Sequence, residues 1–137
     1  MQPYWLDRKR RYNITLMTDL KSLQQKIVKF RDARDWKQFH NPKDLAISLT
    51  LEASEFLEHF QWKNSEEALR HIRAHKEELG DELADVLYWV LLISNDLEID
   101  ILDASEKKLR KNNEKYDVAH SKGNHKKYTE LNHESQN

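Results

Sequence analysis

The sequence contains no cysteine, and it has only two glycines and two prolines among 137 residues. The absence of cysteine excludes disulfides, thiolate nucleophiles and cysteine-ligated zinc or iron–sulfur sites. The scarcity of glycine and proline argues against an all-β fold, which needs frequent turns. Leu, Lys, Glu and Asp are the abundant residue types instead. We therefore expect an all-α protein.

A long apolar run is also missing, and so is a strong net charge of either sign. The longest apolar stretch, residues 86–93, is far too short to cross a bilayer, and no secretory signal is visible. The formal charge of −1 gives no electrostatic reason to expect a nucleic-acid polymer as a partner. We expect a soluble cytoplasmic protein that binds neither a membrane nor a nucleic acid.

The length predicts one domain with a narrow core, because 38% of the residues are hydrophobic and 34% are charged. Such a core favours self-association, which would bury more apolar surface. We interpret residues 1–18 as a flexible N-terminal extension rather than a functional arm. A helical domain is expected at 19–116, followed by a polar tail at 117–137.

Apolar residues at helical spacing, together with end signals, predict four or five helices. Asn41-Pro42 and the pair Asp100 and Asp103 are typical of helix starts. An aromatic loop at 34–42 should separate the first two helices. The expected helical ranges are about 19–33, 42–60, 65–96 with an interruption, and 101–115.

Two acidic pairs, Glu52/Glu55 and Glu82/Asp85, are each three residues apart. Residues at this spacing lie on one face of a helix, so each pair directs two carboxylates the same way. Four carboxylates from two helices could hold Mg²⁺ or Mn²⁺, which prefer oxygen ligands. Apolar residues surround Asp85, and a buried carboxylate needs a metal ion or a salt bridge as its partner. Solvated acidic pairs are common in a chain with 24 acids, so spacing alone leaves both alternatives open.

The acids lie in two short motifs, L-E-A-S-E at 51–55 and E-L-A-D at 82–85. Three further motifs accompany them, R-D-W-x-Q-F-H-N-P at 34–42, F-Q-W at 60–62 and K-K-Y-T-E-L at 126–131. The acidic motifs resemble the E-x-x-E…E-x-x-D signature of the MazG-like nucleotide pyrophosphohydrolases. The other three resemble the small dCTP pyrophosphatase-like branch of that family.

This resemblance, which covers about residues 19–131, implies a four-to-five-helix bundle that assembles as a homodimer or homotetramer. It implies Mg²⁺-dependent hydrolysis of a (deoxy)nucleoside triphosphate, with dCTP or a modified dCTP as a candidate, to the monophosphate and pyrophosphate. Glu52, Glu55, Glu82 and Asp85 match the family's metal ligands. A metal-bound water would attack the α phosphorus, and Glu52 or Glu55 would take its proton.

Aromatic and basic residues supply the candidates for substrate binding. Trp36 and Trp62 match aromatics that enclose the base in the family, although each could instead plug an end of the bundle. His40 could equally be a surface or capping histidine, and Trp89 could be a core residue. The full set of candidates is Trp36, His40, Trp62, Trp89, Lys115 and Tyr116.

Two departures from the dCTP-preferring relatives concern the nucleotide pocket. Ile27 stands where a histidine is expected, and Trp89 stands where a tyrosine is expected. The base preference is therefore not predicted. The competing hypothesis is a non-catalytic helical module for dimerisation or nucleotide sensing, which would need no metal.

Overall fold

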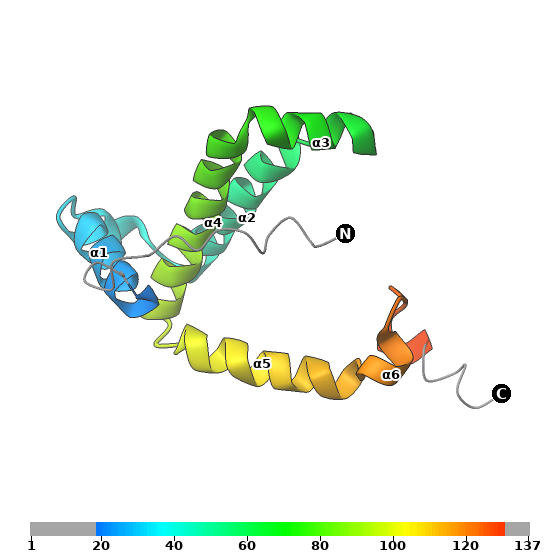
Figure 1. The fold of residues 1–137 in the computed structure, drawn as a ribbon. Coiled ribbons are helices and arrows are strands. Elements are labelled where there is room, and N and C mark those ends of the chain that lie inside the picture. Colours follow the sequence, from blue (N-terminus) through cyan, green and yellow to red (C-terminus); the bar gives the residue numbers. More distant parts are fainter. Residues whose placement is uncertain (1–18, 131–137) are drawn as a thin grey trace, which may run out of the picture. The chain divides into compact units, whose positions relative to one another are not determined.

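The computed structural model describes residues 19–130, and this range contains helices and no strand (Figure 1). The expected all-α fold is confirmed. None of the helices in the described range is long and apolar enough to span a membrane. In chain order the elements are α1 (Leu20–Asp32), the 3₁₀ helix η2 (Trp36–Phe39), α2 (Pro42–Glu58), α3 (Ser65–Ala74), α4 (Lys76–Asp96), α5 (Ile101–Lys115) and α6 (Val118–Ser121).

Local side-chain signals fix where α2 and α5 begin, as the sequence predicts. The Asn41 side chain accepts a hydrogen bond from the backbone N–H of Asp44 at 3.0 Å, and Pro42 occupies the first turn. Asp100 accepts one from the N–H of Asp103, also at 3.0 Å. Each cap satisfies a backbone donor that the first turn of a helix leaves unpaired.

The helical segment expected at 65–96 is two helices, broken at His75. The backbone of His75 has φ −122° and ψ 35°, outside the helical region, and Figure 1 shows the chain changing direction there. Asn64 caps α3, which begins at Ser65. Its side chain accepts from the N–H of Glu67 at 3.0 Å, and the Glu67 side chain accepts from the N–H of Asn64 at 2.8 Å. This reciprocal capping box anchors the start of α3.

Asn64→Ala should lower the free energy of unfolding by about 1 kcal/mol, because it leaves N–H groups of the first turn of α3 without their acceptor. Asn64→Ser should retain most of the stability, since a serine hydroxyl can accept the same bond. Urea denaturation followed by circular dichroism measures both. Equal losses in the two variants would contradict a capping role.

The described residues divide into two compact units, 19–92 and 93–130. In the first unit α2 and α4 lie side by side (Figure 1), and α1 is tied to α4 by the Gln24 side-chain N–H, which donates to the carbonyl of Leu91 at 2.9 Å. The core of this unit is narrow, as its composition predicts. Its buried apolar residues are Ile27, Leu45, Leu79, Leu91 and Leu92.

The second unit contains α5 and α6. Asp117 caps α6 by accepting from the N–H of His120 at 3.2 Å, so the described part of the predicted polar tail includes this short helix. The predicted N-terminal extension, residues 1–18, lies outside the described residues, as do residues 131–137 of the tail. The expected domain at 19–116 takes residues from both units, and its bounds stay a prediction.

Candidate active site

Three of the four acids singled out from the sequence come together in the first unit. Glu52 on α2, and Glu82 and Asp85 on α4, each offer a carboxylate oxygen, and these oxygens lie within 4.8 Å of one another. Ligands around a Mg²⁺ ion are about 3–4 Å apart, because the metal–oxygen distance is about 2.1 Å. The donor set is all oxygen, which suits Mg²⁺ or Mn²⁺. The residues present therefore fit a hard divalent cation.

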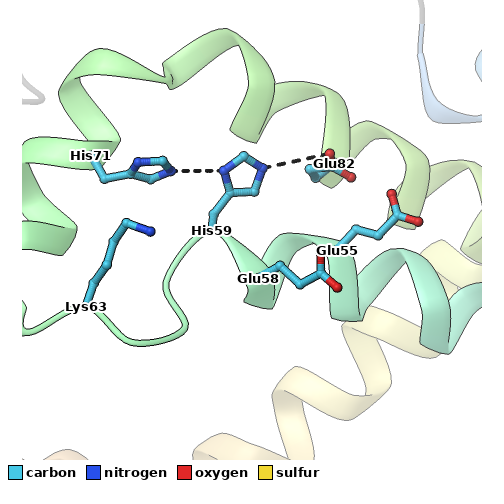
Figure 2. A pocket seen from close by; sticks show the side chains of 6 residues that line it. All are labelled: Glu55, Glu58, His59, Lys63, His71 and Glu82. Carbon is cyan, nitrogen blue, oxygen red and sulfur yellow. Dashed lines mark hydrogen bonds and ion pairs between the residues drawn. The ribbon is translucent and has the colours of Figure 1, made fainter.

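Glu55, the fourth acid, lies outside this group of three. It lines a separate cleft together with Glu82 (Figure 2). Because Glu82 belongs to both, Glu55 borders the acidic group without sharing its tightest cluster. Its assignment as a metal ligand stays a prediction.

Trp89 holds one of the acids in place. Its indole N–H donates to Glu52 Oε1 at 3.2 Å, which joins α4 to α2 at the level of the acidic group. The ring is half-buried and also contacts Tyr88 and His40, with centroid distances of 5.3 Å and 5.6 Å. Trp89 thus lies at the acids as well as in the wall of the neighbouring cleft.

The expectation that Asp85 is buried is wrong for the single chain. Asp85 is exposed, and so is Leu83 two residues earlier, at 53%. This part of α4 is packed on one side only, so apolar neighbours along the helix do not enclose the carboxylate. Because Asp85 is exposed, the cost of burying a charge is no evidence for a metal ion here. The evidence for a metal site is the convergence of the three carboxylate oxygens.

An aromatic cleft of about 490 Å³ opens beside the acids. Two of the three converging acids, Glu52 and Asp85, form part of its wall. The other lining residues come from α1, η2 and α4 and are Lys26, Ile27, Phe30, Trp36, Tyr88 and Trp89. A wall of planar rings next to carboxylates could accept a flat base and a cation-bound phosphate chain.

Edge-to-face contacts orient the rings of this aromatic cleft. Phe30 meets Trp36 at 5.9 Å and 77°, and it meets Tyr88 at 6.2 Å and 88°. The guanidinium of Arg34 lies 3.6 Å from the Phe30 ring centroid, a cation–π contact. Burial raises the pKa of the Tyr88 hydroxyl, partly opposed by Arg31 and Arg34. Tyr88 therefore stays protonated at neutral pH and can donate a hydrogen bond.

Among the predicted substrate-binding residues, Trp36 and Trp89 line the aromatic cleft, whereas His40 is not part of its lining and contacts the Trp89 ring. Trp62 does not line it. Trp62 has φ 69° and is 92% exposed, so the alternative that it plugs an end of the bundle is wrong for the single chain. The binding roles of all four stay predictions.

Lys115 and Tyr116 lie at the end of α5 in the second unit. Both contact Tyr128: the ammonium of Lys115 lies 4.9 Å from its ring centroid, and the Tyr116 ring lies 5.9 Å from it. Tyr128 belongs to the K-K-Y-T-E-L motif, so this motif and the end of α5 form one local cluster. Substrate binding by Lys115 and Tyr116 stays a prediction.

Several lining residues were not singled out from the sequence. Lys26 and Phe30 are four residues apart, and Ile27 and Phe30 are three apart, so all lie on one face of α1. Because the sequence analysis already placed Ile27 in the nucleotide pocket, this spacing could have predicted that Lys26 and Phe30 also line it. Tyr88 was interpreted mainly as a core residue.

A second, polar cleft of about 450 Å³ also borders the acidic group (Figure 2). Two histidines inside it form a chain toward Glu82. His59 Nδ1 lies 3.0 Å from His71 Nε2, and His59 Nε2 lies 3.8 Å from Glu82 Oε1. No spacing pattern in the sequence pairs these two histidines. The lining residues are Glu55, Glu58, His59, Lys63, His71 and Glu82.

The contact between His59 and His71 needs an N–H on one of the two facing nitrogens, and the tautomers of the rings determine which ring donates it. Partial burial, followed by the nearby charges of His75, Lys63 and His59, lowers the pKa of His71. The polar cleft is therefore a crowded group of basic side chains facing acidic ones.

Comparison with known proteins shows where this arrangement belongs. The sequence model of the MazG-like family matches residues 47–131, more than half of the chain. The chain belongs to the MazG-like family. A dCTP pyrophosphatase 1 from Mus musculus is 34% identical over 82% of this MazG-like chain and 67% of the relative. That of Homo sapiens is 30% identical over 90% of this chain and 74% of the relative.

A solved structure supports the same placement. The crystal structure of a pyrophosphatase from Archaeoglobus fulgidus is 37% identical and matches with a TM-score of 0.68, covering 72% of this MazG-like chain and 92% of that one. The dCTP pyrophosphatase-like branch expected from the motifs is confirmed. The class of enzyme, a nucleoside triphosphate pyrophosphohydrolase, is confirmed with it.

Proposed function

We propose that this enzyme hydrolyses a pyrimidine deoxynucleoside triphosphate, dCTP or a modified dCTP, to the monophosphate and pyrophosphate with Mg²⁺ as cofactor. The observation that carries the proposal is that Glu52 and Asp85 line a cleft whose other walls are largely aromatic. A base on the rings then brings its phosphates to the acids. The names of the relatives, dCTP pyrophosphatases, support the choice of base.

Glu52, Glu82 and Asp85 would hold Mg²⁺, with Glu55 as a further ligand, and Mn²⁺ would suit the same donors. Bound there, the ion would offset two of the negative charges of the site and make an attacking water more acidic. Without such a cation the carboxylates would repel a triphosphate. The indole N–H of Trp89 keeps the Glu52 carboxylate in position for this role.

The reaction forms one bond and breaks one. The oxygen of a water forms a bond to the α phosphorus, and the bond from that phosphorus to the oxygen bridging to the β phosphate breaks. Pyrophosphate leaves with the bridging oxygen, and a carboxylate takes the water proton before releasing it to solvent. Trp89 already engages Glu52, so we assign the proton to Glu55.

The aromatic cleft would select the base by stacking and by its few polar groups. Trp36 and Trp89 offer faces or edges to the ring, and Tyr88, which also lines the cleft, carries a hydroxyl that can donate a hydrogen bond. Ile27 offers the base no hydrogen bond. We expect selection to depend more on Tyr88 and Lys26 than on the position that Ile27 occupies.

A homodimer or homotetramer is part of the proposal. Exposed apolar residues on α2 and α4 would then be covered by a second copy, and light scattering after size exclusion measures the assembly. The exposed apolar residues that a second copy would cover are Ile47, Leu51, Leu57, Leu83 and Leu87.

The cytoplasmic location expected from the sequence stays a prediction.

Incubation of the purified protein with a panel of deoxy- and ribonucleoside triphosphates and Mg²⁺ tests the reaction. We expect the monophosphate and pyrophosphate, with no free phosphate, as measured by ³¹P NMR. EDTA should abolish turnover, and excess Mg²⁺ or Mn²⁺ should restore it, because the acids need a cation before they can accept phosphates.

In ¹⁸O-labelled water the label should enter the monophosphate, since attack is at the α phosphorus. Label in pyrophosphate would place the attack on the β phosphorus instead. If no nucleotide is cleaved with either metal, the non-catalytic binding module is the correct interpretation. If nucleotides are cleaved, competition between them identifies the preferred base.

A further inference from the structure

The polar cleft and the aromatic cleft meet at the same acidic group. Glu52 and Asp85 line the aromatic cleft, whereas Glu82, whose oxygen lies with theirs, lines the polar one. A substrate centred on these acids therefore has two directions in which to extend. The aromatic cleft offers rings on which a base can stack, and the polar cleft contains none of those rings.

The chemistry of the polar cleft fits phosphate rather than a base. Figure 2 shows Lys63 and His71 at one end, Glu55 and Glu82 at the other, and His59 between them. None of the six lining residues is aliphatic, and Lys63 points its ammonium toward the histidines. A group bound here would meet a cation at the acidic end and basic side chains at the opposite end.

We propose that the polar cleft binds the pyrophosphate half of the triphosphate, and later the pyrophosphate product, with Lys63 and His71 as its anion contacts. The inference rests on the proposed function, whose base and α phosphate occupy the aromatic cleft and the acids. Lys63 and His71 are substrate-binding residues in this scheme. Cleavage at the acids then separates the nucleotide into two parts, one in each cleft.

The acids in the polar cleft make binding conditional on the cation. Glu55, Glu58 and Glu82 face Lys63, His59 and His71, so a polyanion gains little from the cleft as it stands. A divalent cation on Glu82 and Glu55 would offset the net negative charge of the three glutamates and Lys63, so a polyanion would no longer be repelled. Pyrophosphate should therefore bind with Mg²⁺ and not in EDTA.

Isothermal titration of the full chain with pyrophosphate, and separately with dCMP, tests the inference in the presence of Mg²⁺. Lys63→Met keeps the aliphatic stem, and we expect it to weaken pyrophosphate binding by about tenfold or more, because a charge-assisted hydrogen bond is lost. His71→Gln should weaken it in the same direction. Binding of dCMP should stay within about twofold of wild type in both variants.

Lys43→Met is the matched control, because Lys43 starts α2, is 79% exposed and lies outside both clefts. It should leave both affinities unchanged. Thermal melts establish that every variant is folded. Unchanged pyrophosphate affinity in Lys63→Met and His71→Gln would overturn the inference, and so would an equal loss for both ligands, which would mean that these residues only support the acids. A wild-type enzyme that cleaves no nucleotide would instead refute the proposed function.

Discussion

Asp85→Asn should reduce turnover on the order of a thousandfold while leaving helix content and self-association unchanged. Asparagine keeps nearly the same shape but removes one of the three charges whose oxygens lie within 4.8 Å. A metal ion contributes several kcal/mol of charge stabilisation in the transition state, and about 1.4 kcal/mol corresponds to a tenfold change in rate. Because Asp85 is exposed, its replacement should not disturb the core.

Asp81→Asn is the control, one turn earlier on the exposed surface of α4 and outside both clefts. Its turnover should stay within about twofold of wild type. Electron paramagnetic resonance of bound Mn²⁺ shows whether the loss of turnover comes from a loss of metal, since Asp85→Asn should also weaken Mn²⁺ binding. Full activity and full Mn²⁺ affinity in Asp85→Asn would mean that the cation is held elsewhere.

A comparison of Glu55→Gln with Asp85→Asn tests two roles of Glu55, as a metal ligand and as the acceptor of the water proton. Glu55 lies outside the tight group of three, so its loss should affect Mn²⁺ affinity less than the loss of Asp85 does. Turnover should still fall steeply if Glu55 takes the proton from water. The ratio of the two effects thus shows whether Glu55 acts mainly as a metal ligand or mainly as the proton acceptor.

The parts of the fold that could be predicted from the sequence are those encoded over a few residues. Asn41 and Asp100 cap their helices through side chains that reach only three residues along the chain. The acidic spacing is local in the same sense. Residues three apart share a face of a helix, which is why Glu82 and Asp85 come together as predicted.

The features that the sequence could not predict depend on residues far apart in the chain. His59 and His71 are twelve residues apart and meet only because α2 and α3 are turned by the segment between them. The break at His75 has neither glycine nor proline to mark it. Asp85 looked buried because its neighbours along the helix are apolar, but burial depends on what packs against the helix. In this chain one side of α4 is open.

Trp36→Ala should raise KM for the nucleotide by about 5- to 150-fold with little change in kcat, because stacking a base on an aromatic ring contributes about 1–3 kcal/mol. Trp36 lines the aromatic cleft, is 44% exposed, and is oriented by its edge-to-face contact with Phe30. It carries no group that takes part in bond breaking. Since KM can differ from the dissociation constant, titration with dCMP should confirm the loss directly.

Phe39→Ala is the matched control, in the same 3₁₀ helix but 65% exposed and outside the cleft. It should leave KM within about twofold. Pyrophosphate affinity should be unchanged in Trp36→Ala, the opposite of the pattern expected for Lys63→Met. A fall in kcat without a change in dCMP affinity would mean that Trp36 positions the acids instead of the base. Trp62 is 92% exposed in the single chain. Trp62→Ala should therefore weaken nucleotide binding only if a second copy or the substrate itself brings Trp62 to a cleft.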